Sequence, residues 1–355
     1  MIFDIFLVEA IINGILFGGV LALLALGLNL VFGVVDVVWI CYAELAMVGM
    51  YSIYWGNNHF GIPLVICVVI AILAVALLGF LIHFLVIRPI LGSPPINQLL
   101  VTGGLLFFMQ SFATLLFTGD FRNLGLHLPV LELAEMYISF SRLIAFFTAL
   151  LAMVALYMFL KRTYLGAAIR AISQDREVVV LMGVNPQRVY LVASALGGGL
   201  AGIGAALLIL QYDVHPTIGI SFGPITFMIC VLGGLGNMIG GFIAAFVMSQ
   251  LISLGGFFLD TEWGYVIAFV FFIIMMFIGI YVPSVNSLSD FHHCSQPHLP
   301  LHLFLHDTSA YATAQCWRVS CCVLGATIDE RLMLMRLVAS PPQLRPNGFR
   351  VRHEL

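Results

Sequence analysis

Long apolar runs without a formal charge alternate with short charged segments along this chain. The uncharged stretches are 10–35, 45–87, 89–119, 143–160, 189–212, 214–259 and 263–289. A helix needs about 20 apolar residues to cross roughly 30 Å of hydrocarbon, and only helices or closed barrels satisfy their backbone groups in lipid. The pattern therefore predicts an all-α polytopic helix bundle with about eight spans, near residues 8–27, 29–53, 62–87, 97–118, 143–160, 189–212, 222–252 and 263–282.

The composition indicates that lipid is the solvent of this bundle. Hydrophobic residues make up 62% of the 355 residues, charged residues make up 9%, and the mean hydropathy is +1.10. A soluble domain has about 45–50% apolar and about 25% charged residues. The N-terminus carries Asp4 and Glu9 rather than a positive segment, so we expect no cleavable signal and a first apolar run that remains as a span.

Lysine and arginine predict the orientation of the spans. Residues 161–188 hold five of the eight Lys and Arg residues found in 1–283, and basic loops face the cytoplasm. The 88–96 loop, with Arg88 and three prolines, is expected on the same side. The 119–142 loop carries two arginines and three acidic residues and is expected outside, as is the N-terminus.

The polar segment 163–190 is the most distinctive part of the chain. A short helix pair broken near Gly183 and Pro186 would project from the membrane as a stiff knob. Such a rigid element would suit the polar groove of a partner that drives helix motion. The alternative is an ordinary basic loop that only sets the topology. The residues expected to carry the coupling are Gly166, Arg170, Asp175, Arg176, Glu177 and Gly183.

Glycines gather in two of the later spans. Small residues allow helix backbones to approach closely in lipid, which explains Gly197 and its glycine neighbours as packing. The run VLGGLGNMIGG at 231–241 also permits a second interpretation, a helix broken beside a polar pathway. The pathway candidates in this run are Gly233, Gly234, Gly236 and Asn237.

Glu44 is the strongest candidate for a pathway residue among the early spans. An ionisable group at membrane depth is costly, so it tends to face a cavity or a partner. Asp36 is expected nearer the membrane edge. The span 97–118 adds polar groups that suit either helix–helix hydrogen bonding or substrate contact, namely Gln98, Thr102, Gln110 and Ser111.

The sequence contains no signal for an enzyme. No nucleophile-and-base constellation is evident, and the only lysine, Lys161, is not preceded by glycine as a phosphate-binding loop requires. We therefore expect a chain that does not hydrolyse ATP, with no cofactor and no nucleic-acid partner. His298, His302 and His306 would share a helical face, but Pro300 lies between them, and we assign no metal site.

The character of the chain changes near residue 284. The segment 284–355 holds six of the ten histidines, four of the seven cysteines and several prolines, without a helical period. We expect a transmembrane domain at 1–283, followed by an atypical tail at 284–355. The tail is predicted to be disordered or to come from a non-native reading frame.

Four segments resemble the permeases of ABC importers for branched-chain amino acids. Glu177 and Gly183 fit the Glu-Ala-Ala-x-x-x-Gly spacing of ABC permeases, within LGAAIRAISQDRE and LMGVNPQRVY. Three other blocks, spread in order across 10–283, also resemble this family. They are NGILFGGVLALLALGLNLVFGV at 13–34, ELAMVGMY at 44–51 and VHPTIGISFGPITFMICVLGGLGNMIGG at 214–241.

The resemblance implies a multi-pass permease of the bacterial inner membrane that imports branched-chain amino acids. It implies separate ATP-binding cassette subunits that hydrolyse ATP, a second permease subunit, identical or different, an external substrate-binding protein and surrounding membrane lipid as partners. The run Trp39-Ile40-Cys41-Tyr42-Ala43 departs from the Asn-Phe-Ala-His-Gly-like run of that family. This departure leaves open a same-family permease for urea or another small amide. A secondary transporter without an ATPase and an intramembrane enzyme are further alternatives, though the sequence lacks the coupling acids or clustered catalytic groups they need.

Overall fold

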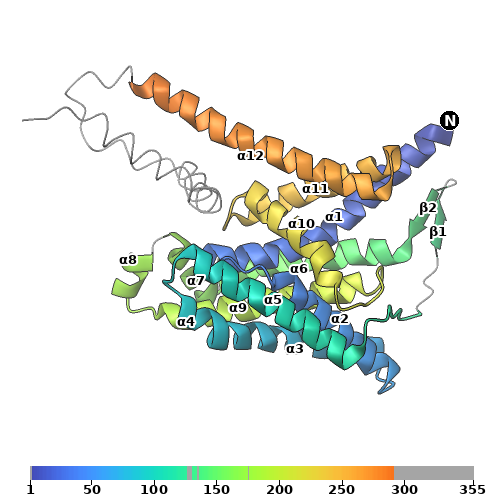
Figure 1. Cartoon of the computed structure of the whole chain (residues 1–355), viewed down its shortest axis with the longest axis horizontal. Coiled ribbons are helices and arrows are strands. Elements are labelled where there is room, and N and C mark those ends of the chain that lie inside the picture. The colour runs from blue at the N-terminus through green and yellow to red at the C-terminus, as the bar shows by residue number, and fades with distance from the viewer. Residues whose placement is uncertain (1, 126–129, 134–135, 175, 292–355) are drawn as a thin grey trace, which may run out of the picture.

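The long helices lie side by side along one direction in the computed structural model, which describes residues 2–125, 130–133, 136–174 and 176–291 (Figure 1). Six of the described helical spans are long and apolar enough to cross a membrane. They belong to α1 (Ile2–Val35), α3 (Leu64–Ile82) with η1 (His83–Ile87) and α4 (Arg88–Ile90), α5 (Pro95–Phe117), α6 (Phe140–Arg162), α9 (Pro186–Leu208) and α11 (Met238–Phe258).

Shorter elements complete the bundle. α2 (Tyr42–Asn58) and α10 (Ile218–Gly233) lie within it, and α12 (Thr261–Phe291) follows α11. Two short helices, α7 (Tyr164–Gln174) and α8 (Arg176–Leu181), lie between α6 and α9. The strands β1 (Val130–Leu133) and β2 (Met136–Ser139) form an antiparallel hairpin with Val130 opposite Ser139. The predicted all-α bundle is confirmed, with this one hairpin added.

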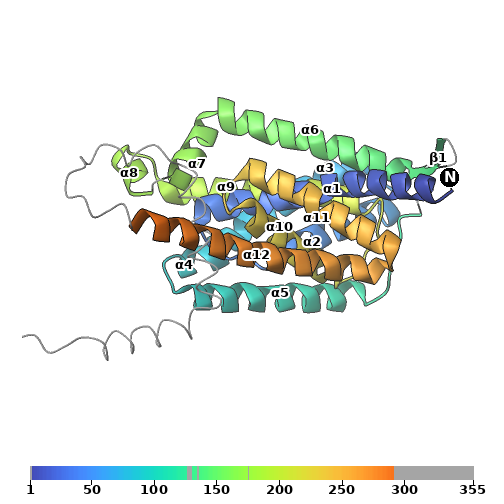
Figure 2. The same ribbon diagram turned by 90° about the horizontal axis from the view of Figure 1, so that it is seen from above.

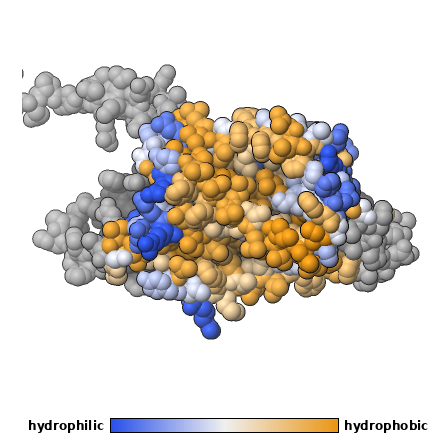
Figure 3. Space-filling model, turned by 90° about the horizontal axis from the view of Figure 1, so that it is seen from below, coloured by the Kyte–Doolittle hydropathy of each residue, from blue (hydrophilic) through white to orange (hydrophobic). Residues whose placement is uncertain are grey.

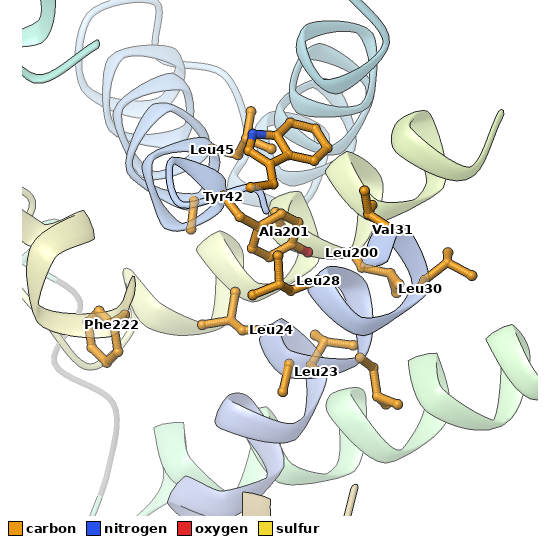
Figure 4. Packing of buried hydrophobic residues seen from close by; sticks show 14 of the residues in the cluster. Leu23, Leu24, Leu28, Leu30, Val31, Tyr42, Leu45, Leu200, Ala201 and Phe222 are labelled. Carbon is orange, nitrogen blue, oxygen red and sulfur yellow. The ribbon is translucent and has the colours of Figure 1, made fainter. Parts of the chain in front are cut away.

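Helix α1 forms the centre of the bundle. Apart from Asn29, its residues from Val20 to Val35 are apolar on every side, and a helix of this kind must be buried on every side. α6, α9, α10 and α11 surround it, as Figure 2 shows for α6 and α11. Figure 4 shows the resulting core, in which α1 leucines pack against α2, α9 and α10 through Tyr42, Leu45, Leu200, Ala201 and Phe222.

The first glycine cluster holds α9 against α3. A Cβ atom on Gly198 would lie 2.6 Å from the carbonyl oxygen of Val75, and one on Gly202 would lie 2.8 Å from the Cα atom of Ile72. On the α3 side, a Cβ atom on Gly79 would lie 2.8 Å from the carbonyl oxygen of Ser194. Contact this close between backbones requires glycine on both helices, which confirms the packing interpretation for this cluster.

We expect Gly198→Ala to destabilise the protein, although alanine is a better helix former than glycine. The added methyl group would push against α3 backbone, and overpacking of this kind costs about 1–3 kcal/mol. Gly199→Ala is the matched control, because its Cβ atom would only touch the Ala76 methyl group at 3.8 Å. The midpoint of thermal unfolding in detergent should fall for Gly198→Ala alone. Equal midpoints for the two variants would contradict the tight α3–α9 contact.

The two ends of the bundle agree with the predicted alternation of loops. At one end, Arg88 Nη2 donates a hydrogen bond to Gln187 Oε1 at 3.1 Å, which joins the two loops expected on the cytoplasmic side. At the other end, Asn123 Nδ2 donates to Asp213 Oδ1 at 2.8 Å, close to the hairpin and the N-terminus (Figure 1). Figure 3 shows apolar side chains as a broad band between more polar ends. The chain is a multi-pass membrane protein.

Two of the expected spans are wrong. The predicted span 29–53 is interrupted, because α1 ends at Val35 and α2 begins only at Tyr42. Non-helical backbone is tolerated inside a membrane protein where side chains satisfy it, and here Thr102 Oγ1 donates to the Val38 carbonyl oxygen at 3.0 Å. The predicted span 222–252 is likewise two helices, α10 and α11, separated at Gly234–Asn237.

The boundary expected at 283 lies inside a helix, because α12 continues to Phe291. Most of the expected tail, 292–355, lies outside the described residues, and so do the three histidines at 298, 302 and 306. The division of the chain at 283/284 therefore stays a prediction.

Candidate functional site

Two interrupted helices begin at the same place inside the bundle. α2 starts at Tyr42 after the break at 36–41, and α10 starts at Ile218 after the segment 209–217. The Cβ atom that Gly223 lacks would lie 3.5 Å from the Ala43 methyl group, so the first turns of the two helices are in contact. Discontinuous helices that meet inside a membrane protein provide polar groups for substrates and ions.

Glu44 lies at this meeting point with a side chain that is 0% exposed. Gln110 of α5 donates a hydrogen bond from Nε2 to Glu44 Oε1 at 2.7 Å. The carboxylate packs flat on α10, because a Cβ atom on Gly219 would fall within 2.5 Å of all three carboxyl atoms. Glu44 Oε2 has no hydrogen-bond partner within the described part of the chain. A buried carboxylate with one free oxygen is costly to fold and is therefore a functional candidate.

The altered run 39–43 forms the wall beside Glu44. Trp39 Nε1 donates to Cys41 Sγ at 2.9 Å, and the Tyr42 hydroxyl donates to the Gly197 carbonyl oxygen at 2.9 Å. The Trp39 and Tyr42 rings meet edge to face with centroids 6.0 Å apart. The run therefore brings two buried aromatic side chains to the start of α2, and their polar atoms are already hydrogen-bonded.

The predicted break at the second glycine cluster is confirmed. Gly234 and Gly236 adopt φ angles of 88° and 85°, a left-handed conformation that favours glycine. A Cβ atom on Gly233 would lie 2.3 Å from the backbone nitrogen of Gly241, so the ends of α10 and α11 touch. Asn237 caps α11, where its Oδ1 atom accepts from the Gly240 N–H at 3.1 Å.

Asn29 of α1 fixes this break, a role that the sequence did not indicate. Its side chain is 0% exposed. The Nδ2 atom donates to the Asn237 carbonyl oxygen at 2.8 Å, and Oδ1 accepts from the Gly236 N–H. Gly33 approaches the same turn, since a Cβ atom there would lie 2.7 Å from the Gly236 Cα atom. The α10–α11 break is therefore held against the C-terminal half of α1.

We expect Asn29→Leu to lower the free energy of unfolding by about 1–3 kcal/mol, because it removes two hydrogen bonds and leaves the Gly236 N–H unsatisfied, while the Asn237 carbonyl oxygen still accepts from the Gly241 N–H. Asn13→Leu, the same change on the same helix, is the control. Chemical denaturation in detergent compares the two variants. A cost no larger than that of Asn13→Leu would show that Asn29 does not hold the break.

The polar segment predicted to couple to a partner forms α7 and α8 at the end of the bundle (Figure 1). α7 folds tightly back on α6, because a Cβ atom on Gly166 would lie 2.5 Å from the Leu160 Cα atom. Gly183 ends the segment in an exposed turn with φ 79°, and a Cβ atom there would meet no atom within 4 Å in the part of the chain that the structure describes. Arg170 is exposed, Glu177 lies on α8, and Asp175 lies outside the described residues.

Arg176 connects this segment to the α1–α2 break. Its guanidinium lies 3.6 Å from the Asp36 carboxylate and donates to the Val34 carbonyl oxygen at 3.4 Å. It also lies over the Tyr190 ring, 5.7 Å from the ring centroid. The sequence predicted that Arg176 faces a partner, whereas in the structure its side chain contacts other residues of this chain. The 36–41 segment that Arg176 holds leads directly to Glu44.

The predicted pathway residues thus form two groups rather than one. Glu44 lies where α2 meets α10, and Gly233, Gly234, Gly236 and Asn237 lie at the α10–α11 break. No metal centre is evident in the part of the chain with described coordinates, since it contains no cluster of three or more His, Cys, Asp and Glu side chains suited to a metal ion. The roles of the predicted site residues in transport and coupling stay predictions.

Comparison with known protein families and with individual proteins places the chain in one family. Residues 10–276 match the family described as branched-chain amino acid transport system, permease component. The chain is 24% identical over 283 residues to the permease protein BraD of Pseudomonas aeruginosa, covering 76% of this chain and 92% of BraD. Against LivH of Escherichia coli K12 it is 25% identical over 293 residues, covering 77% of this chain and 94% of LivH.

A second permease type also matches. The chain is 27% identical over 250 residues to LivM of Escherichia coli K12, covering 64% of this chain and 59% of LivM. No solved structure gives a significant match. The match to the family covers more than half of the chain and includes both helix breaks and the α7–α8 segment. This chain belongs to the family of branched-chain amino acid transport system permease components.

Proposed function

We propose that this chain is the membrane-spanning subunit of an ATP-driven importer of branched-chain amino acids in the bacterial inner membrane. Its relatives BraD and LivH carry the name of high-affinity branched-chain amino acid permease proteins. Separate ATP-binding cassette subunits would hydrolyse ATP, an external binding protein would deliver the substrate, and a second permease subunit would complete the pathway. The additional similarity to LivM supports a pair of related permeases.

The connection from α8 to Glu44 is the observation that carries this proposal. An ATPase that closes on the α7–α8 segment would displace Arg176, and Arg176 holds Asp36 and Val34 at the start of the break before α2. The displacement would therefore reach α2, whose first turn carries Glu44. A short rigid element that moves a discontinuous helix is a direct way to open and close a buried pathway.

The meeting point of α2 and α10 suits an amino acid. The N-termini of two helices carry partial positive charge and favour a substrate carboxylate. Glu44 Oε2, which is free of hydrogen bonds among the described residues, would accept the substrate ammonium group. The surrounding apolar residues, including Ile218 and Phe222, suit a branched aliphatic side chain. The tight contact between Glu44 and Gly219 corresponds to a closed pathway that must separate during transport.

We expect Arg176→Gln to reduce uptake by at least several-fold without releasing the ATPase subunits, because the link to the α1–α2 break is lost while the outer surface of α8 remains. Arg188→Gln, at an exposed arginine of α9, is the control. Uptake and ATP hydrolysis are measured on the same proteoliposomes. If both variants transport equally well, the link through Asp36 plays no part in coupling.

Purification of the tagged full-length chain from its native membrane tests the whole proposal. Subunits that co-purify are identified by mass spectrometry, and the complex is reconstituted for uptake of leucine and of urea with and without ATP. ATP-dependent leucine uptake is the expected result. ATP-dependent uptake of urea but not of leucine would change the proposed substrate to a small amide, which would agree with the altered run 39–43. Uptake that needs no ATP, or purification without any ATPase subunit, would refute the proposal of an ATP-driven importer.

A further inference from the structure

We infer that the chain binds the headgroup of an anionic phospholipid in a cavity between α1, α6, α7 and the start of α11. The cavity has a volume of about 360 Å³ and lies at the end of the bundle that carries α7. Its polar lining comes from Asn29, Lys161, Arg170, Ser173 and Asn237. The lining includes no residue of α2 or α10, so this site is separate from the meeting point at Glu44.

The charge of the lining favours an anion. Lys161 and Arg170 both contribute to it, and the described lining residues include no carboxylate. Within the part of the chain that the structure describes, neither cation forms an ion pair with an acidic side chain. Basic pockets between transmembrane helices on one side of the membrane bind lipid headgroups in this way.

Two further features place a phosphate group in this cavity. α11 begins at its wall with Met238 and Ile239, and the N-terminus of a helix this long favours a negative charge. The Lys161 ammonium lies over the exposed Tyr157 ring, 5.7 Å from its centroid. Tyrosine next to lysine at the end of a span is typical of the level at which lipid headgroups lie.

A row of apolar side chains continues from the cavity along α1, α6 and α11. It begins one turn further along each helix: Leu26 follows Leu30 on α1, Met153 follows Tyr157 on α6, and Phe242 follows Met238 on α11. The other residues of this row are also apolar, namely Gly19, Ala22, Leu23, Phe146, Ala149, Leu150 and Phe246. A basic cavity next to an apolar row suits a phospholipid, with its headgroup in the cavity and a chain lying over the row.

Native mass spectrometry of the full-length protein, purified with its subunits in mild detergent, tests this inference. Phosphatidylglycerol, phosphatidylcholine and inorganic phosphate are titrated separately. We expect bound phosphatidylglycerol to exceed phosphatidylcholine. We expect the double variant Lys161→Gln, Arg170→Gln to weaken phosphatidylglycerol binding by at least about tenfold, since each cation near an anionic lipid contributes about 1 kcal/mol. Arg162→Gln, a neighbouring cation outside the lining, is the matched control.

A second variant tests the apolar row without changing any charge. Leu150 is 36% exposed, so Leu150→Trp would place a larger side chain where the lipid chain is expected to lie. It should reduce binding of phosphatidylglycerol while leaving that of inorganic phosphate unchanged. Wild-type binding by both the double variant and Leu150→Trp would overturn the inference. Binding of inorganic phosphate without phosphatidylglycerol would overturn it too and assign the cavity to a free anion. If the double variant kept its lipid but lost another permease subunit, the cavity would instead belong to a protein interface.

Discussion

Gly183→Asp is expected to abolish ATP-driven uptake while leaving the protein folded in the membrane. The turn at Gly183 has φ 79°, which aspartate tolerates at a cost of about 1 kcal/mol. No atom of the described residues lies within 4 Å of the new Cβ atom, so the substitution creates no clash among them. A large loss of uptake would therefore come from a partner that covers this turn. An unmatched charge in an interface costs several kcal/mol, which corresponds to a loss of at least about tenfold in binding.

Gly61→Asp is the matched control for this variant. Gly61 also has a left-handed φ angle, 62°, with open space around its Cβ position, but it lies in the turn between α2 and α3. Co-purification of the ATPase subunits and uptake are measured for both variants. Only Gly183→Asp should lose the ATPase. Normal uptake by Gly183→Asp, or equal loss in both variants, would refute the assignment of this turn to partner docking.

Most of the helices could be predicted from the sequence because lipid imposes a simple rule on them. Runs such as 89–119 and 189–212 have no charge and enough length to cross the membrane; α5 lies within the first, and all but the first three residues of α9 lie within the second. The break at 36–41 was missed because the apolar residues Val37 and Val38 follow Asp36, so one charged residue did not by itself indicate that the helix ends. Thr102, which satisfies the Val38 carbonyl group, lies 64 residues away in the sequence.

Within the candidate site, only features carried by a local pattern could be predicted, namely the lone acid Glu44 and the glycine-rich break between α10 and α11. Glu44 is a lone acid within an apolar run, and this was enough to select it. Its contacts with Gln110 and Gly219 come from the packing of α5 and α10, which no local pattern reveals. The role of Arg176 was missed for the same reason, since Asp36 lies far from it in the sequence and is brought near by the end of α1.

Glu44→Gln is expected to lower uptake by about 10- to 100-fold without loss of stability. The glutamine side chain has the same size and can still accept the hydrogen bond from Gln110 through its amide oxygen. It removes a buried charge that is only half satisfied, and such a change is often neutral or stabilising. Uptake should fall nonetheless, because a hydrogen bond between charged groups contributes about 1.5–3 kcal/mol and the substrate ammonium would lose its anionic partner.

Two measurements separate a role in transport from a role in folding. Glu262→Gln, at an exposed carboxylate near the start of α12, is the control for loss of a negative charge. For Glu44→Gln, the thermal midpoint in detergent should be unchanged or higher, and ATP-driven leucine uptake should fall well below that of Glu262→Gln. A lower midpoint with proportionate loss of uptake would make Glu44 a structural residue. Uptake equal to that of the control would exclude Glu44 from substrate recognition, because the carboxylate would then be replaceable by an uncharged group of the same shape.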